Sequence, residues 1–245
     1  MRKLERKWHR ELAVIGVHSP KFIAERDTES VRQAILRLNV GHPVVNDRDF
    51  RVWQAYAVRA WPTLMFIDPR GKVIGKHEGE FPLEPFDRLI REMVQEFDTH
   101  GLLDRRPRTV SRESRPATAL SFPGKVLADP AEDRLFVSDT GHNRIVECDL
   151  DGAVRRLFGS GAEGCDDGPA DRASFYQPQG LAGDAGTLYV ADTENHALRA
   201  VNLATGAVTT IAGTGEPLMG ERVGGPARRT ALSSPWDVSV LDGTV

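Results

Sequence analysis

Two stretches of the chain, VSDTGHNRI at residues 137–145 and VADTENHAL at residues 190–198, decide how its second half folds. Each opens with apolar residues that predict a short β-strand, and each then runs through Asp-Thr into a turn rich in Asn and His. The matching pairs outside these stretches are Leu135 with Leu188, Gly152 with Gly206, and Pro178 with Pro235. A repeat of about 53–57 residues, with three or four short β-runs in each copy, predicts an array of small sheets.

The polar residues of the two turns have a structural explanation. A carboxylate can accept hydrogen bonds from the backbone of a tight turn, and Asn or His tolerates the left-handed conformation that such turns use. The alternative is that some of them line a central opening of the array and contact a ligand. Two histidines that each sit inside a turn do not form a metal-ligand pattern, so we expect neither a metal nor a cofactor. The candidate residues are Asp139, His142, Asn143, Asp192, Asn195 and His196.

The first hundred residues alternate between short strands and helices, which predicts an α/β domain. The strands are predicted at residues 11–16, 42–47, 63–68 and 72–80, and the last two form an antiparallel hairpin. The helices are predicted at residues 31–40 with Ser30 as N-cap, at 50–58, and at 82–101 with an apolar stripe of Phe86, Leu89, Ile90, Met93 and Phe97.

The segment Trp61-Pro62-Thr63 carries the main signal of this α/β half. A proline just before a strand removes a ladder donor, so it marks either a sheet edge or a cis turn. In this order of elements, residues 4–100 resemble a thioredoxin-like domain. The resemblance implies that Pro62 is a cis-proline and that Trp61, Pro62 and Thr63 shape a substrate groove. No Cys-x-x-Cys is present, so we expect the first strand and the start of the active-site helix to lie upstream of residue 1.

The Asp-Thr stretches resemble NHL repeats, which build β-propellers. Together with the thioredoxin-like half, and with the segments IGVHSPKF, HPVVND, WPT and SPWD, they make the chain similar to the NHL-repeat-containing protein 2 family. The resemblance implies a six-bladed propeller, of which about two blades and a stub at residues 233–245 are present. We therefore expect the chain to be truncated at both ends. The predicted domains are 1–100 (thioredoxin-like), 101–118 (linker) and 119–245 (partial propeller).

Charge and composition narrow the possible partners. Residues 119–245 are strongly acidic, and the arginines of the linker lie beside Pro107 and Pro116, so nucleic acid is not an expected partner. No apolar run approaches the length of roughly 18 residues that a membrane span needs. Cys148 and Cys165 are too few and too widely spaced for a disulfide scaffold, which favours a cytoplasmic location.

Two functions follow from the resemblance. The parent protein would be a thiol–disulfide oxidoreductase-like protein whose propeller binds protein clients. The alternative is a non-catalytic scaffold or protein-interaction module, with the thioredoxin-like half kept for packing. The sequence names no catalytic residue and leaves open whether the parent is an enzyme, since the chain lacks the Cys-x-x-Cys that would discriminate between the two.

Overall fold

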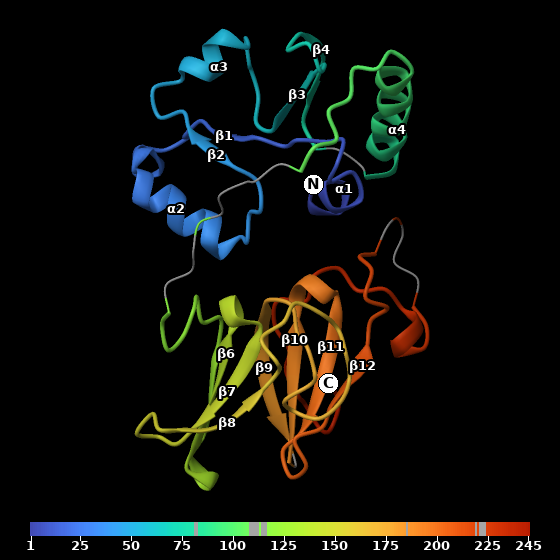
Figure 1. Cartoon of the computed structure of the whole chain (residues 1–245). Helices are drawn as coiled ribbons and strands as arrows, with labels where there is room; N and C mark the ends of the chain where they lie inside the picture. Colours follow the sequence, from blue (N-terminus) through green and yellow to red (C-terminus); the bar gives the residue numbers. More distant parts are fainter. Residues whose placement is uncertain (81–82, 108–112, 114–116, 185, 219, 221–223) are drawn as a thin grey trace. The chain divides into compact units, whose positions relative to one another are not determined.

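A computed structural model divides the chain into two compact units, Met1–Arg115 and Pro116–Val245 (Figure 1). The structure describes residues 1–80, 83–107, 113, 117–184, 186–218, 220 and 224–245. The division falls inside the predicted linker 101–118, of which Arg108, Arg112, Arg115 and Pro116 lie outside the described residues.

The N-terminal unit follows the predicted order of strands and helices after an initial helix, but the strand predicted at residues 11–16 was wrong in position, since the first strand is Gly16–His18. Its elements are α1 (Arg2–Lys7), β1 (Gly16–His18), η1 (Ile23–Arg26), α2 (Thr28–Arg37), β2 (Val44–Asn46), α3 (Arg51–Ala55), β3 (Thr63–Ile67), β4 (Val73–Glu78) and α4 (Leu83–Thr99). The prediction of Ser30 as the N-cap of α2 was wrong. Asp27 holds that position, and its carboxylate accepts the Ser30 backbone N–H at 2.8 Å.

The strands of this unit form two small sheets rather than one. β1 pairs with β2 in parallel, Gly16 opposite Val44, while β3 pairs with β4 antiparallel, Thr63 opposite Glu78. Among the described strands, β1 and β3 are not paired with each other. The core of the unit lies where α1 and α4 pack against β3, and its buried residues are Leu4, Phe86 and Ile90. Leu89, predicted in the same stripe, is 38% exposed.

The C-terminal unit contains two four-stranded antiparallel sheets, one for each predicted repeat (Figure 1). The first sheet consists of β5 (Val126–Asp129), β6 (Arg134–Asp139), β7 (Arg144–Cys148) and β8 (Val154–Phe158). The second consists of β9 (Pro178–Asp184), β10 (Thr187–Asp192), β11 (Ala197–Asn202) and β12 (Val208–Ala212). Short 3-10 turns lie at η2 (Pro130–Glu132), η3 (Thr140–His142), η4 (Thr193–Asn195) and η5 (Ala227–Arg229).

One core joins the two sheets. Ile145 and Phe158 of the first sheet are fully buried with Leu188 and Val201 of the second, and Phe175 from the connection between them is buried as well. Burying five such side chains contributes roughly 1.5–3 kcal/mol each. The two repeats therefore stabilise each other, as expected for sheets that cannot cover their apolar faces alone.

A third copy of the repeat starts at Pro235 and packs against the second sheet. The Thr193 hydroxyl donates to the Pro235 carbonyl at 2.7 Å, and Asp237 forms an ion pair with Lys125. Gly180 of β9 allows this approach, since a Cβ at Gly180 would overlap the backbone of Asp237. In this copy the structure shows an isolated bridge between Leu241 and Thr244.

Gly180→Ala should therefore destabilise the C-terminal unit by about 1–3 kcal/mol, because the added methyl group must push the third copy away. Gly183→Ala, in the same strand, is the matched control. Its Cβ would meet Leu127 at an ordinary 3.4 Å, so its effect should stay within about 0.5 kcal/mol. Urea unfolding of both variants measures the difference, and equal midpoints would show that the third copy does not pack against β9.

Candidate functional site

The predicted turn residues lie where β6 and β10 end. Each strand passes through a 3-10 turn into a residue in the left-handed conformation, Asn143 with φ 53° and His196 with φ 50°. The tolerance of Asn and His for positive φ explains their presence. Asn195, by contrast, lies within η4 and acts through its side chain.

Asp139 is completely buried and accepts hydrogen bonds from three directions. The Ser121 backbone N–H donates to Oδ1 at 2.7 Å. His142 Nδ1 and Arg144 Nε each lie 2.8 Å from Oδ2. The carboxylate thus joins the start of its own repeat to the turn and to the next strand, which is a structural role.

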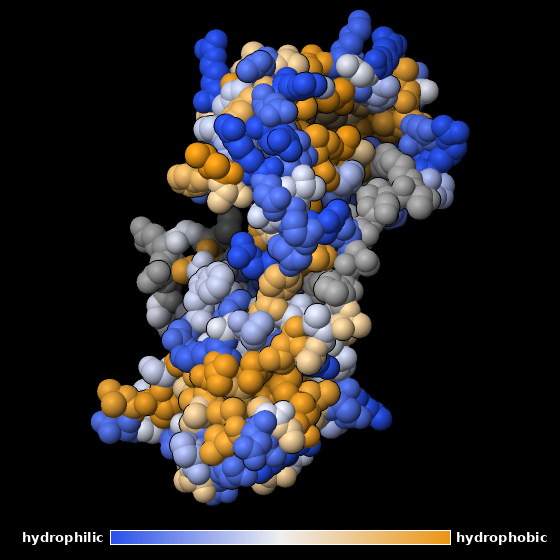
Figure 2. All heavy atoms as spheres, turned by 90° about the vertical axis from the view of Figure 1, so that its left-hand side faces the viewer, coloured by the Kyte–Doolittle hydropathy of each residue, from blue (hydrophilic) through white to orange (hydrophobic). Residues whose placement is uncertain are grey.

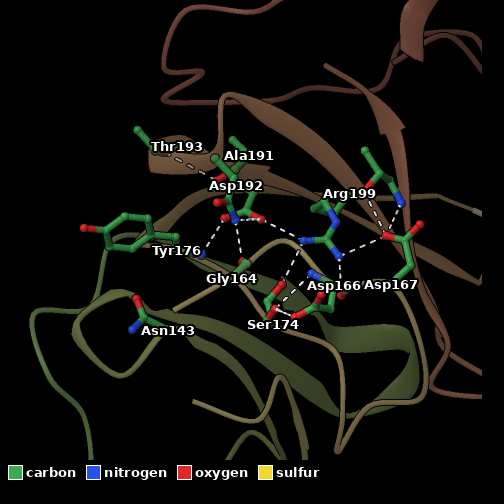
Figure 3. Close-up of polar contacts among 12 residues, drawn as sticks. Asn143, Gly164, Asp166, Asp167, Ser174, Tyr176, Ala191, Asp192, Thr193 and Arg199 are labelled. Carbon is green, nitrogen blue, oxygen red and sulfur yellow. Dashed lines mark hydrogen bonds and ion pairs between the residues drawn. The ribbon is translucent and has the colours of Figure 1, made fainter. Parts of the chain in front are cut away.

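Asp192 has the equivalent position in the second repeat, and its partners differ (Figure 3). The Tyr176 backbone N–H donates to Oδ1 at 2.8 Å, while Asn195 Nδ2 and Arg199 Nη1 reach Oδ2 at 2.8 and 2.9 Å. Both the Asp192 carboxylate and the Arg199 guanidinium are 0% exposed. The pair is therefore a buried ion pair, unlike the half-buried pair of Arg144 and Asp139.

Arg199 also forms hydrogen bonds to the segment that precedes β9 (Figure 3). Its Nη1 donates to the Ser174 carbonyl and its Nη2 to the Asp166 carbonyl, both at 2.8 Å. Nη2 also lies 3.1 Å from Asp167 Oδ1, which in turn accepts the backbone N–H and the hydroxyl of Thr210. A single side chain thus fixes residues 166–174 against β11 and β12.

Burial sets the electrostatics of this cluster. It raises the pKa of Asp192 to about 6, against the opposing effect of the hydrogen bonds from Asn195, Tyr176 and Arg199. Arg199 Nε is buried and has no hydrogen-bond partner among the described residues. The cluster holds its charges by mutual pairing, which is how proteins tolerate ions away from water.

The same turns also hold the next repeat. Asn143 Oδ1 accepts the Gln177 backbone N–H at 3.0 Å, and His196 Nδ1 accepts that of Ser234 at 3.0 Å. The Thr140 hydroxyl donates to the Pro178 carbonyl at 2.6 Å, as that of Thr193 does to Pro235. At each proline, Pro178 or Pro235, the turn of the preceding repeat thus accepts the N–H of the residue before the proline and donates a hydroxyl to the proline carbonyl. We call this pair of hydrogen bonds the proline joint.

The cis-proline turn belongs to the N-terminal unit. The Trp61–Pro62 peptide bond is cis. Trp61 Nε1 donates to the Ser19 carbonyl at 2.9 Å, and the Trp61 ring lies 4.2 Å from that of Trp53. The Thr63 hydroxyl donates to the Ala60 carbonyl at 2.7 Å. A substrate groove at Trp61, Pro62 and Thr63 stays a prediction.

Apolar side chains of this turn, and of the segment that contacts it through Ser19 and Lys21, are open to solvent. Trp61 is 44% exposed, Phe22 68% and Ile23 85%. The Lys21 ammonium lies 5.2 Å from the centre of the Trp61 ring, within the range of a cation–π contact. We call these four residues the Trp61 surface.

Neither cysteine belongs to the Trp61 surface. Cys148 and Cys165 both lie in the C-terminal unit, and burial raises the pKa of both thiols. A raised pKa disfavours the thiolate that nucleophilic attack requires. Among the described residues, no group of three or more His, Cys, Asp and Glu side chains could hold a metal ion, and no helix is long and apolar enough to cross a membrane.

Arg199 and Asp167 were not among the residues predicted for this site. The two repeats place the arginine differently, five residues after Asp139 but seven after Asp192. The alignment of the copies therefore gave no common position for it. The signal that was available is the Leu-Arg pair that follows the second turn at residues 198–199.

Arg199→Leu should cost about 3–5 kcal/mol of unfolding free energy, because it leaves the buried Asp192 carboxylate without its cation. Arg144→Leu is the matched control and should cost about 1 kcal/mol, since the Arg144 side chain is 26% exposed. Denaturant unfolding of both variants at pH 7 tests this. Equal losses would contradict a special role for the buried pair.

The Asp192 carboxyl should also make stability depend on pH. Its pKa is about 6 in the folded chain against the ordinary 3.8, so the folded state binds the proton more tightly. Its contribution to the free energy of unfolding is full below pH 3.8 and is lost as the pH rises through 6. Asp192→Asn removes this component, and unfolding measured from pH 4 to pH 7 should show it. Parallel profiles for the two proteins would exclude the shift.

Comparison with known proteins agrees with the prediction of NHL repeats in the C-terminal unit. The family model of the NHL repeat matches residues 175–200, which include β9, β10, η4 and the first part of β11 with Arg199. NHL repeat-containing protein 2 of Gallus gallus is 37% identical over 229 residues, which cover 93% of this chain and 32% of that protein. The chloroplastic Protein SUPPRESSOR OF QUENCHING 1 of Arabidopsis thaliana is 40% identical over 244 residues, 96% of this chain and 23% of the relative.

A solved structure is similar at a lower level. The structural genomics protein of unknown function from Bacteroides thetaiotaomicron is 24% identical, with a TM-score of 0.43 over 49% of this chain and 30% of its own. A TM-score of this size does not decide the fold. The chain spans about a third or less of the length of the two sequence relatives. It carries an NHL repeat and resembles the NHL repeat-containing protein 2 family over nearly its whole length.

Proposed function

We propose that this chain is a protein-binding module, in which a thioredoxin-like unit and an NHL-repeat unit each offer a surface to other polypeptides. The observation that carries the proposal is the Trp61 surface. Three large apolar side chains stand exposed beside a cis-proline turn, on a unit whose own core lies elsewhere. Exposed apolar groups gathered in one place mark interaction sites more often than scattered ones do.

The order of elements supports a thioredoxin-like arrangement for the N-terminal unit. After α1 come a strand, a helix, a second strand and the short helix α3, and the cis-proline then precedes a hairpin and a final helix. The hairpin pairs β3 with β4, and α4 covers it through Phe86 stacked on Phe66, with ring centres 5.8 Å apart. The turn is thereby held at the start of a packed strand.

The Trp61 side chain is held in one position before any partner binds, which favours binding of an extended peptide. Trp61 is fixed by the Ser19 carbonyl and by Trp53, so binding costs little further side-chain entropy. Phe22 and Ile23 supply apolar contact, and Lys21 supplies a positive charge. The proposed partner is therefore a polypeptide with an apolar side chain next to an acidic or carbonyl group.

Hydrogen bonds of Ser19 and Asp47 support the Trp61 surface from within the unit. Ser19 donates its hydroxyl to Asp47 Oδ2 at 2.9 Å, and Asp47 accepts the backbone N–H groups of Val52 and Trp53 at the start of α3. The Asp47 carboxylate thus accepts two N–H groups of the first turn of α3, which have no partner within the helix, and holds the loop after β1 in place. This bonding explains Ser19 and Asp47 as structural residues beside the surface.

The second candidate is a thiol–disulfide oxidoreductase, which the cis-proline favours. Within this sequence the cysteines are Cys148 and Cys165, so a thiol facing Pro62 would have to come from another segment. The coding sequence read in frame on both sides of this stretch tests the candidate. A Cys-x-x-Cys directly upstream would favour the oxidoreductase, and a stop codon there would remove it.

Selection of peptides from a displayed random library on the immobilised chain tests the binding proposal. Peptides that bind the unaltered chain should lose at least tenfold in affinity with Trp61→Ala or Ile23→Asp, since each removes a contact worth more than about 1.4 kcal/mol. Val73→Asp is the control, because Val73 is 50% exposed on β4 and outside the Trp61 surface. Equal binding by all three variants would refute the proposal.

A further inference from the structure

Strand β4 has an outer edge that pairs with no other strand among those that the structure describes. It pairs with β3 on its inner side, and the hairpin is a separate two-stranded sheet. Exposed apolar side chains occur on both units (Figure 2), so apolar exposure does not by itself single out one surface. A free strand edge is more specific, because its backbone N–H and C=O groups form a regular row that fits another extended strand.

The hydrogen bonds of the hairpin determine which residues of β4 face outward. The Gly79 N–H donates to the Pro62 carbonyl at 2.9 Å, so these two residues form a hydrogen-bonded pair of the antiparallel ladder. Such pairs alternate with non-hydrogen-bonded ones, so His77, two residues earlier, also bonds toward β3. The backbone groups of Lys76 and Glu78 therefore point to the free edge.

The helix on one face of the hairpin leaves this edge accessible. α4 lies beside the hairpin (Figure 1), and its Phe86 ring contacts the His77 ring with centres 5.0 Å apart. An open groove of about 450 Å³ runs between β4 and α4, and Leu89 on its helical side is 38% exposed. Gly75 contributes no side chain to the groove. The space along residues 75–77 of β4 is therefore not filled by the helix.

The other face of β4 carries one positive and one negative charge, two residues apart. Lys76 and Glu78 form an ion pair at 2.5 Å, with side chains 35% and 38% exposed. Alternation along the strand places both on the face opposite His77. β1, β2 and β3 contain no Asp, Glu, Lys or Arg. Opposite charges on a free edge specify a register, whereas a lone lysine only discourages pairing.

We propose that β4 pairs with β4 of a second copy of this chain, antiparallel and with the twofold axis at His77. In this register Lys76 of one copy lies opposite Glu78 of the partner subunit, and the same contact occurs twice. Because both residues have outward-facing backbone groups, each of these pairs exchanges two hydrogen bonds. The two hairpins become one four-stranded sheet with a symmetric interface. The interface uses none of the residues of the Trp61 surface.

Other registers of the same pairing are less favourable. An axis at Lys76 or at Glu78 places two like charges directly opposite each other. An axis between two residues sets an outward-facing residue against one that bonds toward β3, which leaves backbone groups unpaired. An axis at Gly75 brings the irregular register between residues 73 and 75 into the pairing. Charge and backbone direction thus select the same axis.

A disulfide trap tests this register. The Cα atoms of a non-hydrogen-bonded pair are about 4.5 Å apart, within the range of roughly 4.4–6.8 Å that a disulfide spans. His77→Cys should therefore link two copies under mild oxidation. Lys76→Cys is the matched control, because its two Cα atoms are offset by two residues and lie about 8–9 Å apart.

Peptide mass analysis distinguishes a link between two residues 77 from a link to Cys148 or Cys165, and thermal unfolding shows that each variant is folded. The contact is far smaller than the roughly 1,200 Å² of a stable complex, so the association is weak and the trap collects it over time. Failure of folded His77→Cys to link, or equal linking by Lys76→Cys, overturns the proposal.

Charge reversal tests the same register without a cysteine. Lys76→Glu sets two glutamates opposite each other, and Glu78→Lys sets two lysines opposite each other. Each variant alone should self-associate at least tenfold more weakly than the unaltered chain in sedimentation, because two attractive pairs become repulsive. Arg70→Glu, a reversal at an exposed position outside β4, is the control and should leave self-association unchanged.

A mixture of the two charge variants gives the sharpest result. In a mixed dimer every residue 76 faces the opposite charge at residue 78, so association should return to the level of the unaltered chain. The ion pair within each copy stays broken, and restored association can therefore arise only between copies. A mixture that associates no better than its components overturns the proposal, as does an unaltered chain that stays monomeric throughout a concentration series.

Discussion

A buried carboxylate at the end of the second strand organises each repeat of the C-terminal unit. Asp139 and Asp192 are fully desolvated, so each of their carboxylate oxygens must accept hydrogen bonds from the protein. The donors come from three places: the start of the same repeat, the turn, and the following strand. Because one side chain binds all three, the path of the chain between the first and third strands is fixed by a single residue.

The two repeats satisfy this constraint in different ways. Asp139 uses His142 and the partly exposed Arg144, whereas Asp192 uses Asn195 and the fully buried Arg199. A buried pair adds little net stability over an apolar one, but loss of one partner is costly. Arg199 offsets its desolvation by also binding the carbonyls of Ser174 and Asp166, which order the connection before β9. The second repeat is thus tied together by a fully buried ion pair, and the first by an ion pair whose arginine is partly exposed.

Much of this arrangement follows from the sequence, for identifiable reasons. The Asp-Thr turns were predictable because the carboxylate and the left-handed Asn or His act locally, within a few residues of each other. Arg199 was not, since its partners at residues 166 and 174 are distant in sequence. The N-cap of α2 was predicted at Ser30 instead of Asp27, because Ser and Asp are both good N-cap residues. Only the backbone geometry distinguishes the two positions. In the N-terminal unit, the hairpin of β3 and β4 was predictable because a short turn joins its strands. The first strand was placed at residues 11–16 instead of Gly16–His18, and its pairing with β2 joins segments that are distant in sequence.

The proline joint explains why the repeats must occur next to one another. A residue other than glycine in the left-handed conformation costs on the order of 1–3 kcal/mol, and a following proline restricts it further. The joint contributes two hydrogen bonds, each stabilising by about 1 kcal/mol, and it accompanies the burial of the proline and of apolar residues such as Leu181. The hydrogen bonds alone only balance the backbone cost, so the apolar contact decides the outcome.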